Sequence, residues 1–335
     1  MAAQRWRIEA RVVELALKEP FVIARRRWDS VPNVFVTVTY GGVMGVGEVS
    51  PEDDPHRVAS DLTSLDLSSL DSPYALESVG DLLPPSDARC ALDIALHDLA
   101  AKSAVLSVSE LLGLSGRPAP ETSVTAPIAG IDDMVARARA LAGHPVLKTK
   151  VGFDGDVDVV AAIRDVFPGR LRVDANEGWS EEEAAERLKA LAGYDIELCE
   201  QPIVRGQRDA LGRVTQASPI PVYADEDVRT AADVARLAGA VDGVNLKLRK
   251  AGGIRETVRA VHVARALGMG VMLGCDLESG VATTAAASLA PLADFVDVDG
   301  PLLLADDPCP GVAYERGSLI LPAGPGLGVN GAPPW

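Results

Sequence analysis

Residues 171–200, LRVDANEGWSEEEAAERLKALAGYDIELCE, contain one complete unit of strand, helix and strand. Leu171–Asp174 and Ile196–Glu200 are short runs of the kind found in buried strands, and the stretch between them is rich in helix formers at helical spacing. A strand that is followed by a helix and a second strand builds a parallel βαβ unit. This stretch therefore predicts two parallel strands joined by a helix.

The same alternation repeats on both sides of this unit. Eight strand-like runs follow residue 120, and alanine-rich helical stretches separate them. The runs are Ser123–Ile128, Val146–Val151, Leu171–Asp174, Ile196–Glu200, Val222–Asp225, Val244–Lys247, Val271–Gly274 and Phe295–Asp299. Eight such units predict an α/β fold with a closed (β/α)8 or TIM barrel. An open doubly wound sheet is the alternative, but no G-x-G-x-x-G motif follows an early strand.

The chain before this repeat has a different pattern. Residues 5–17 and 33–40 are rich in alternating or continuous apolar and β-branched residues, which predicts strands. Residues 56–83 have no regular pattern, whereas residues 86–112 carry apolar positions at helical spacing. Strands that are followed by helices predict an α+β module.

The boundaries follow from composition. Arg117-Pro118-Ala119-Pro120 has the composition of a linker, and the segment from residue 306 onward is rich in Gly and Pro. We expect residues 1–117 to form the α+β module and residues 118–305 to form the barrel. Residues 306–335 are expected to pack back on the first module and complete it.

Composition excludes several classes of function. The 335 residues are 47% hydrophobic and 24% charged, as in an ordinary folded protein, and the net charge of −16 disfavours nucleic acid and anionic membrane surfaces as partners. The spacing of Cys90, Cys199, Cys275 and Cys309 matches no zinc motif and no small disulfide framework. The N-terminal residues do not resemble a signal peptide, and no run of 18 apolar residues occurs. We therefore expect a cytoplasmic protein with no membrane partner.

Three consecutive predicted strands end in carboxylates, Asp174, Glu200 and Asp225. The C-terminal ends of the strands form the active-site face of a (β/α)8 barrel, so these groups converge. Like charges that converge repel one another unless a cation lies between them, and oxygen ligands with open positions suit Mg²⁺. Each carboxylate could instead cap a separate helix. Their regular spacing favours a Mg²⁺ site.

Two lysines flank these carboxylates. Lys150 ends the second predicted strand and Lys247 ends the sixth, so they face each other across the barrel axis. Near a metal and other cations a lysine can have a lowered pKa and act as a general base, and two such bases can remove a proton from one side of a carbon and return it on the other. Lys148 points the same way as Lys150 and can add positive charge near a developing enolate oxygen. Lysines that face solvent are the alternative.

Five motifs occur in chain order at these strand ends. They are Lys148-Thr149-Lys150, Val173-Asp174-Ala175-Asn176, Glu200-Gln201-Pro202, Ala224-Asp225-Glu226 and Lys247-Leu248-Arg249-Lys250-Ala251-Gly252-Gly253. Together they resemble the enolase superfamily, specifically the muconate lactonizing enzyme subgroup. The resemblance implies a Mg²⁺-bound carboxylate substrate that loses its α-proton. It also implies that the three carboxylates are metal ligands, that Lys150 and Lys247 are the acid and base, and that the first module caps the barrel mouth.

The eighth predicted strand indicates which reaction of the subgroup applies. Asp297-Val298-Asp299 resembles the D-x-D signature of dipeptide epimerases, and two aspartates on one face suit a free α-ammonium group. One aspartate could instead cap the next turn. We therefore expect a dipeptide epimerase that inverts the α-carbon of the C-terminal residue through an enolate. The alternatives are o-succinylbenzoate synthase, N-acylamino acid racemase, a muconate cycloisomerase-like enzyme, or a non-catalytic barrel that retains the metal.

Two predicted loops of opposite charge indicate which side chain the final residue of the substrate carries. Arg26 is at the position best matched to the arginine with which related Ala-Glu epimerases bind glutamate, and Glu52 lies in a second loop. Asp276 is at a position that is often apolar in that family, and if buried it requires a cation, either Arg26 or the substrate. If Arg26 pairs with Asp276, the pocket is neutralised and has little charge preference. If Arg26 faces solvent, Glu52 and Asp276 favour a Lys or Arg side chain, and an acidic or an apolar final side chain is the alternative. The substrate is a small dipeptide in each case, and the chain could form a homo-oligomer.

Overall fold

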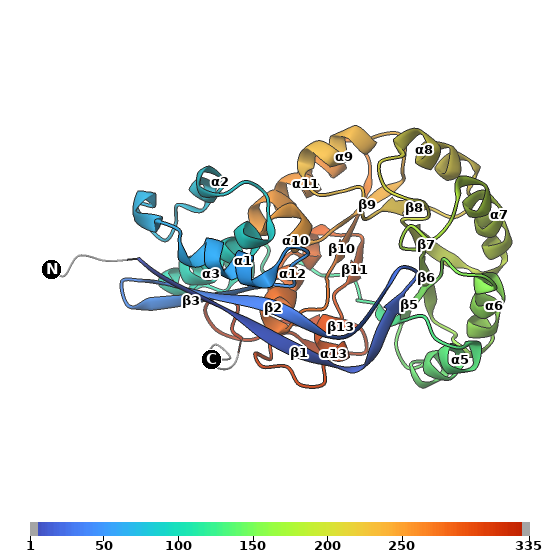
Figure 1. Ribbon diagram of the computed structural model, residues 1–335, viewed down its shortest axis with the longest axis horizontal. Helices are drawn as coiled ribbons and strands as arrows, with labels where there is room; N and C mark the ends of the chain where they lie inside the picture. The colour runs from blue at the N-terminus through green and yellow to red at the C-terminus, as the bar shows by residue number, and fades with distance from the viewer. Residues whose placement is uncertain (1–5, 330–335) are drawn as a thin grey trace.

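The computed structural model describes residues 6–329 (Figure 1). Residue 5, at the start of the first predicted strand, and residues 330–335, at the end of the tail, lie outside the described residues. Figure 1 shows a ring of strands surrounded by helices, and beside it an antiparallel sheet with helices of its own. The part from β1 to α4 is called the cap below.

Eight parallel strands form the ring, and hydrogen bonds link them in chain order. They are β4 (Val124–Ala126), β5 (Val146–Lys150), β6 (Arg170–Asp174), β7 (Ile196–Glu200), β8 (Val222–Ala224), β9 (Gly243–Leu246), β10 (Gly270–Gly274) and β11 (Phe295–Asp297). The Ser123 amide donates to the Val296 carbonyl at 3.1 Å, so the first and last strands nearly close the ring. The predicted barrel and its eight strands are confirmed.

The helices that follow these strands lie outside the ring (Figure 1). They are α5 (Ile131–Ala140), α6 (Asp156–Val166), α7 (Glu181–Leu191), α8 (Arg208–Ala217), α9 (Ala231–Leu237), α10 (Leu248–Ala251), α11 (Ile254–Ala266), α12 (Gly280–Ala287) and α13 (Gly300–Leu303). Helix α7 shows why they form: Ser180 and Glu183 make a reciprocal capping box at its start. Its buried residues Ala184, Leu188 and Leu191 recur on one helix face, so burial of that face stabilises the helix.

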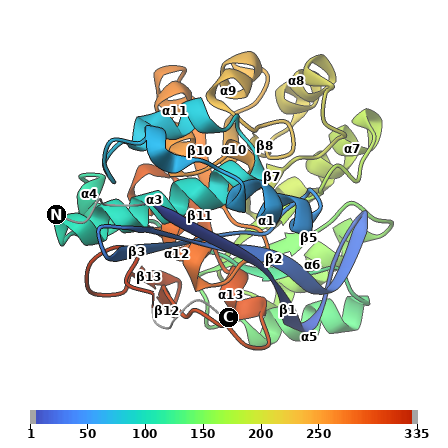
Figure 2. The same cartoon turned by 60° about the vertical axis from the view of Figure 1, so that its left-hand side comes forward.

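The cap consists of a three-stranded antiparallel sheet, four α-helices and two short 3-10 helices. The strands are β1 (Arg7–Ile23), β2 (Arg26–Tyr40) and β3 (Val43–Val49), and the helices are α1 (Pro55–Thr63), α2 (Val79–Leu82), α3 (Asp87–Ala104) and α4 (Val108–Leu111). Figure 2 shows the ribbon of β1 and β2 crossing the molecule with α3 along the sheet. A Cβ atom on Gly45 or Gly47 of β3 would collide with the backbone of α3, so this close packing requires glycine.

The cap differs from the prediction in two places. Arg26, which was expected in a loop, is the first residue of β2, because Phe21 pairs with Trp28 across the ribbon and Ile23 pairs with Arg26, which extends both strands. Residues 56–83 are not irregular throughout, because they contain most of α1 and the whole of α2. Asp54 caps α1 by accepting a hydrogen bond from the His56 amide.

The ribbon and the C-terminal segment both connect the two parts of the molecule. At the ribbon tip the Val22 carbonyl accepts from the Ile128 amide just after β4, at 2.9 Å. Near the C-terminus, β12 (Ala313–Glu315) and β13 (Ser318–Ile320) form a hairpin. The segment after this hairpin returns to the cap, where the Leu327 amide donates to Asp98 at 2.7 Å. None of the described helices is both long and apolar enough to cross a membrane.

Candidate active site

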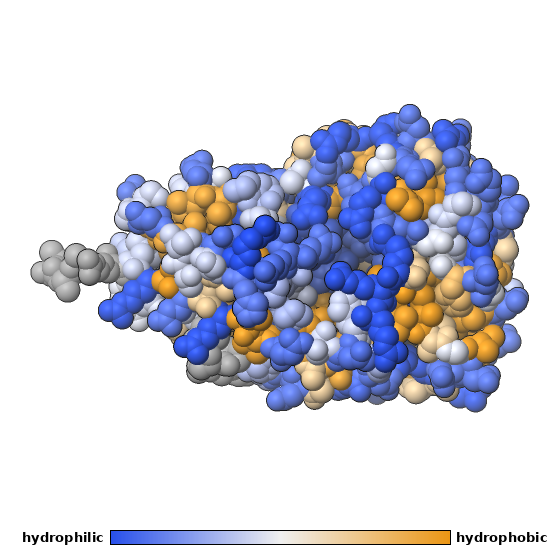
Figure 3. Space-filling model, viewed as in Figure 1, coloured by the Kyte–Doolittle hydropathy of each residue, from blue (hydrophilic) through white to orange (hydrophobic). Residues whose placement is uncertain are grey.

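A cavity of about 550 Å³ lies where the C-terminal ends of the barrel strands face the cap. Figure 3 shows hydrophilic side chains gathered around a hollow between the two parts. Cap residues such as Phe21 and Glu52 and barrel residues such as Lys150 and Lys247 line it together. All of the predicted site residues line this cavity except Asp174 and Glu200, which are fully buried.

The three predicted metal ligands end adjacent strands of the ring. Asp174 and Glu200 are the last residues of β6 and β7 and are paired in register, and Asp225 directly follows β8. All three are at most 2% exposed. Parallel strands in register place their C-terminal side chains side by side, which is why the sequence spacing located this cluster.

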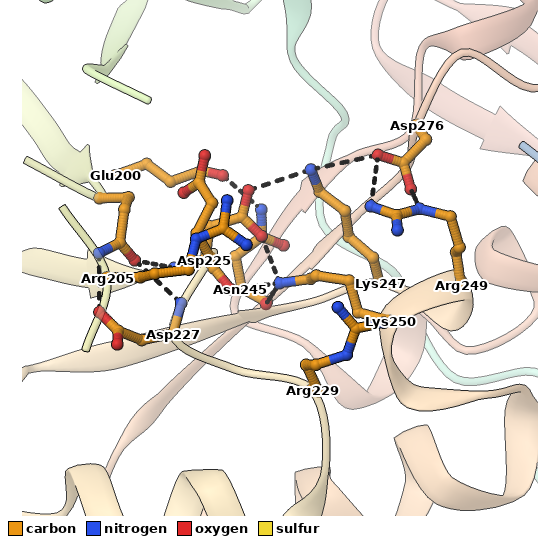
Figure 4. A network of polar contacts seen from close by, with 12 residues as sticks. Glu200, Arg205, Asp225, Asp227, Arg229, Asn245, Lys247, Arg249, Lys250 and Asp276 are labelled. Carbon is orange, nitrogen blue, oxygen red and sulfur yellow. Dashed lines mark hydrogen bonds and ion pairs between the residues drawn. The ribbon is translucent and has the colours of Figure 1, made fainter. Parts of the chain in front are cut away.

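Four lysines compensate these buried carboxylates. Lys150 Nζ lies 2.5 Å from Asp174 Oδ2, and Lys148 Nζ lies 3.1 Å from the same oxygen and 2.7 Å from Glu200 Oε2. Lys247 Nζ lies 3.0 Å from Asp225 Oδ2, and Lys250 also pairs with Asp225. Figure 4 shows Lys247 extended between Asp225 and Asp276.

The pKa values of these carboxylates reflect opposing effects of burial, of the neighbouring carboxylates and of the lysines. Burial would raise the pKa of Asp174, but Lys150 and Lys148 lower it to about 2. For Glu200, burial and the charge of Asp174 raise the pKa to about 7, against the influence of Lys148. Neighbouring carboxylates therefore destabilise one another's ionised forms, and a bound cation would relieve that repulsion.

The donor set fits a hard divalent cation. Asp174, Glu200 and Asp225 offer only oxygen ligands, and no hydrogen bond from the described residues reaches Glu200 Oε2 although it forms an ion pair with Lys148. Within residues 6–329 no three His, Cys, Asp or Glu side chains are already drawn together as a metal cage, because the lysines hold these carboxylates. Binding of Mg²⁺ by these residues would require the carboxylates to exchange lysine contacts for metal contacts.

Lys150 and Lys247 reach the cavity from strands that are four positions apart in a ring of eight. The pKa of Lys247 does not follow the expected lowering. Burial lowers it, but Asp225 and Asp276 contact the ammonium directly and raise its pKa well above the ordinary value. In this structure Asp225 and Asp276 therefore favour the ammonium form of Lys247.

Asp297 and Asp299 both line the cavity, as expected, although β11 ends at Asp297. Asp297 accepts hydrogen bonds from Lys148 at 2.7 Å and Ser123 at 2.6 Å, and Asp299 accepts one from the Thr125 amide at 2.6 Å. Burial and the charge of Asp297 raise the pKa of Asp299 to about 7. A positively charged group placed against Asp299 would therefore favour its ionised form.

The expected partners of Asp276 are corrected by the structure. Arg249, not Arg26, pairs with Asp276, with Nε 2.5 Å from Oδ2 (Figure 4). Glu52 is paired as well, with Arg229 at 3.2 Å and Arg249 at 3.3 Å. Arg26 lies over the Trp28 ring at 5.1 Å and makes no ion pair with another described residue. In this structure Glu52 and Asp276 therefore both have arginine partners already.

Lys250 and Glu226 are further groups at the site that were not predicted, besides Arg249. Lys250 is buried and binds Asp225 because α10 is a single helical turn that places residues 247 and 250 on one side. The Lys-x-x-Lys spacing ahead of Gly252, whose φ is 82°, was the available signal. Glu226 also lines the cavity, and burial together with Asp225 raises its pKa to about 8.

Comparison with known proteins identifies the family. Residues 7–113 match the mandelate racemase / muconate lactonizing enzyme N-terminal domain, and residues 132–333 match the enolase C-terminal domain-like family. An L-Ala-D/L-Glu epimerase from Bacteroides thetaiotaomicron is 38% identical over 94% of this chain and 85% of its own length. A hydrophobic dipeptide epimerase from Roseobacter litoralis is 36% identical over 95% of this chain and 96% of its own length.

The solved structures agree. A dipeptide epimerase from Cytophaga hutchinsonii, solved in complex with Mg and the dipeptide D-Ala-L-Val, superposes with a TM-score of 0.89. It is 32% identical, and the match covers 98% of this chain and 95% of that one. The chain therefore belongs to the dipeptide epimerase family of the enolase superfamily.

Proposed function

We propose that this protein is a Mg²⁺-dependent dipeptide epimerase that inverts the α-carbon of the substrate's C-terminal residue. The observation that carries the proposal is the placement of Lys150 and Lys247, which line one cavity from opposite sides of the ring. An α-carbon held between them has one amine on each face. The epimerases among the relatives support this assignment.

The two lysines perform the proton transfer. One lysine, as the neutral amine, accepts the α-proton, and the C–H electron pair moves into the carboxylate to form an enolate. The other lysine, as the ammonium, donates a proton to the opposite face of the same carbon. The configuration is inverted, and the two lysines have exchanged protonation states. In the reverse reaction each lysine takes the role that the other had.

Asp174, Glu200 and Asp225 would hold Mg²⁺ near the substrate carboxylate. The positive charge of the ion would stabilise the negative charge that develops when the α-proton leaves. Lys148 supplies further positive charge, because its ammonium lies within 3.1 Å of two of these carboxylates and also binds Asp297. Water is restricted around this group, since Lys148 is 2% exposed, so its charge is poorly screened.

Asp297 and Asp299 are assigned to the substrate's free α-ammonium group. Both carboxylates line the cavity, and within the described part of the chain the Thr125 amide is the donor that Asp299 accepts from. An N-acylated amino acid carries no such cation, and it would leave buried Asp299 without a cationic partner among the described residues, whereas Asp297 keeps Lys148. This is the feature that favours dipeptides over the substrates of succinylbenzoate synthases and N-acylamino acid racemases.

The test is α-proton exchange in D₂O with a dipeptide library. Each dipeptide is paired with its N-acetylated form, and exchange at the C-terminal residue is followed by NMR and mass spectrometry. We expect deuterium incorporation and epimerisation with free dipeptides and little with the blocked ones. Preferred turnover of N-acylated substrates would reassign the protein within the subgroup, and no exchange with any substrate would favour a non-catalytic barrel.

A further inference from the structure

Arg249 occupies one edge of the cavity and contacts two carboxylates from different parts of the molecule. Its Nε lies 2.5 Å from Asp276 Oδ2 and its Nη2 lies 3.4 Å from Asp276 Oδ1. Its Nη1 lies 3.3 Å from Glu52 Oε2. The Arg249 side chain is 7% exposed, so these are contacts of a largely buried guanidinium. Figure 4 shows its pair with Asp276.

The charges of the two carboxylates at this edge of the cavity are compensated by cations of the protein itself. Glu52, from the loop after β3, faces both Arg229 and Arg249, and Asp276, after β10, faces both Arg249 and Lys247. Each carboxylate therefore already contacts two cations. A guanidinium stays protonated at all working pH values, so this compensation is permanent.

From these contacts we propose that Arg249 is a specificity-determining residue that substitutes for a substrate cation at Asp276 and Glu52. This inference rests on the proposed function, because it concerns the side chain of the dipeptide. A Lys or Arg side chain of the substrate that enters this edge of the cavity would meet the fixed Arg249 guanidinium. The carboxylates that could bind it, Asp276 and Glu52, are already paired with that guanidinium. Uncharged side chains incur no such repulsion, so they are favoured over cationic ones.

The same contacts predict opposite effects for two substitutions. Arg249→Met keeps the bulk of the side chain but exposes Asp276 and Glu52 to the cavity, which should attract a cationic substrate side chain. Asp276→Asn keeps the shape of the carboxylate but leaves the guanidinium under-compensated, which should attract an anionic one. The double variant removes one charge of each sign and should return toward the parent's preference.

The experiment compares dipeptides whose final side chains are matched in shape. The kcat/KM ratio of L-Ala-L-Lys to L-Ala-L-norleucine reports attraction for a cation, and that of L-Ala-L-Glu to L-Ala-L-Gln reports attraction for an anion. We expect Arg249→Met to raise the first ratio about tenfold, which corresponds to ~1.4 kcal/mol. We expect Asp276→Asn to raise the second ratio in the same measurement. Arg236→Met, which removes an arginine on the exposed face of α9, is the control and should change neither ratio.

Binding of the same dipeptides to the Mg²⁺-loaded protein, measured by calorimetry, gives these ratios without turnover. Parent protein that binds dipeptides but exchanges no α-proton would contradict the proposed function, while shifted binding ratios would still support the role of Arg249.

Active, folded variants with unchanged ratios would overturn that role. If Arg249→Met does not fold, Asp276→Asn decides the matter. A parent that prefers L-Ala-L-Lys to L-Ala-L-norleucine, with the preference lost in Asp276→Asn, would also overturn it.

Discussion

Lys148 Nζ lies 2.7 Å from Asp297 Oδ2, and this contact joins the second strand of the barrel to the eighth. The same ammonium group reaches Asp174 and Glu200, so one buried cation serves three carboxylates from different strands. Such a group is difficult to replace, because its removal leaves several buried anions without their partner.

We expect Lys148→Met to reduce both stability and activity. Removing one partner from a buried ion network costs about 3–5 kcal/mol, and the lost positive charge at the reacting carboxylate should lower kcat by about a hundredfold or more. Urea unfolding and α-proton exchange measure the two effects. Lys189→Met, on the exposed side of α7, is the control and should change neither. Turnover by Lys148→Met at the wild-type rate would show that Lys148 has no role in the reaction.

The two-base mechanism predicts separate defects for the two lysines. Lys150→Ala and Lys247→Ala should each abolish epimerisation, with losses of about 10²–10⁴-fold or more in rate. Each variant should still exchange the α-proton of one substrate epimer, the one whose proton faces the remaining lysine. Deuterium exchange with separate L,L and L,D dipeptides shows this. Near-normal epimerisation by either variant would rule out proton transfer between two lysines.

The assigned metal ligands predict a Mg²⁺ requirement. Treatment with EDTA should stop turnover, and added Mg²⁺ should restore it. Asp225→Asn should stay folded by circular dichroism but bind Mg²⁺ more weakly and show no turnover, because one ligand loses its charge. Calorimetric titration with Mg²⁺ measures the binding. Full activity after exhaustive chelation would contradict the metal assignment.

A buried histidine in the cap predicts a pH-dependent contribution to stability. Burial would lower the pKa of His97, but Asp93 raises it above the ordinary value, and the Asp93 carboxylate also accepts from the Ile254 amide at the start of α11. Because the pKa is higher in the folded state, protonated His97 stabilises the protein below the unfolded pKa of about 6.5, and this stabilisation is lost as pH rises through the folded pKa.

We therefore expect His97→Gln to lower the free energy of unfolding more at a pH of about 5.5 than at a pH of about 9, on either side of the ordinary histidine range. Urea unfolding of both proteins at the two pH values measures the difference. His262, on α11 and outside this contact, provides the control variant His262→Gln. An equal loss of stability at both pH values would show that His97 contributes only through packing.

The sequence was sufficient to predict the barrel and the position of its carboxylates. Alternation of strands and helices is a local pattern, and register between parallel strands fixes which residues meet at the mouth. Asp174, Glu200 and Asp225 could therefore be grouped without a structure. The glycine-containing strand β3 was not predicted, because Gly45 and Gly47 weaken the strand pattern and serve the contact with α3.

The partners of individual charged side chains could not be predicted in this way. Asp276 was expected to pair with Arg26 or with substrate, yet Arg249 is its partner, because β9 and β10 are neighbours and helix α10, which follows β9, meets the loop after β10. Arg26 instead stacks on Trp28, a contact that depends on the extension of β2. A long charged side chain can pair with any of several acceptors within its reach, and the tertiary geometry decides which pair forms.

The near closure of the ring has a consequence for biosynthesis. Ser123 and Val296, which join its two ends, are 173 positions apart in the chain. The cavity at the barrel mouth can therefore be assembled only after the last strand has left the ribosome, and until then the backbone hydrogen-bonding groups at the open strand edge remain unpaired. Contacts of such long range slow folding and expose intermediates to aggregation. We expect nascent chains that end before β11 to depend on chaperones for their solubility.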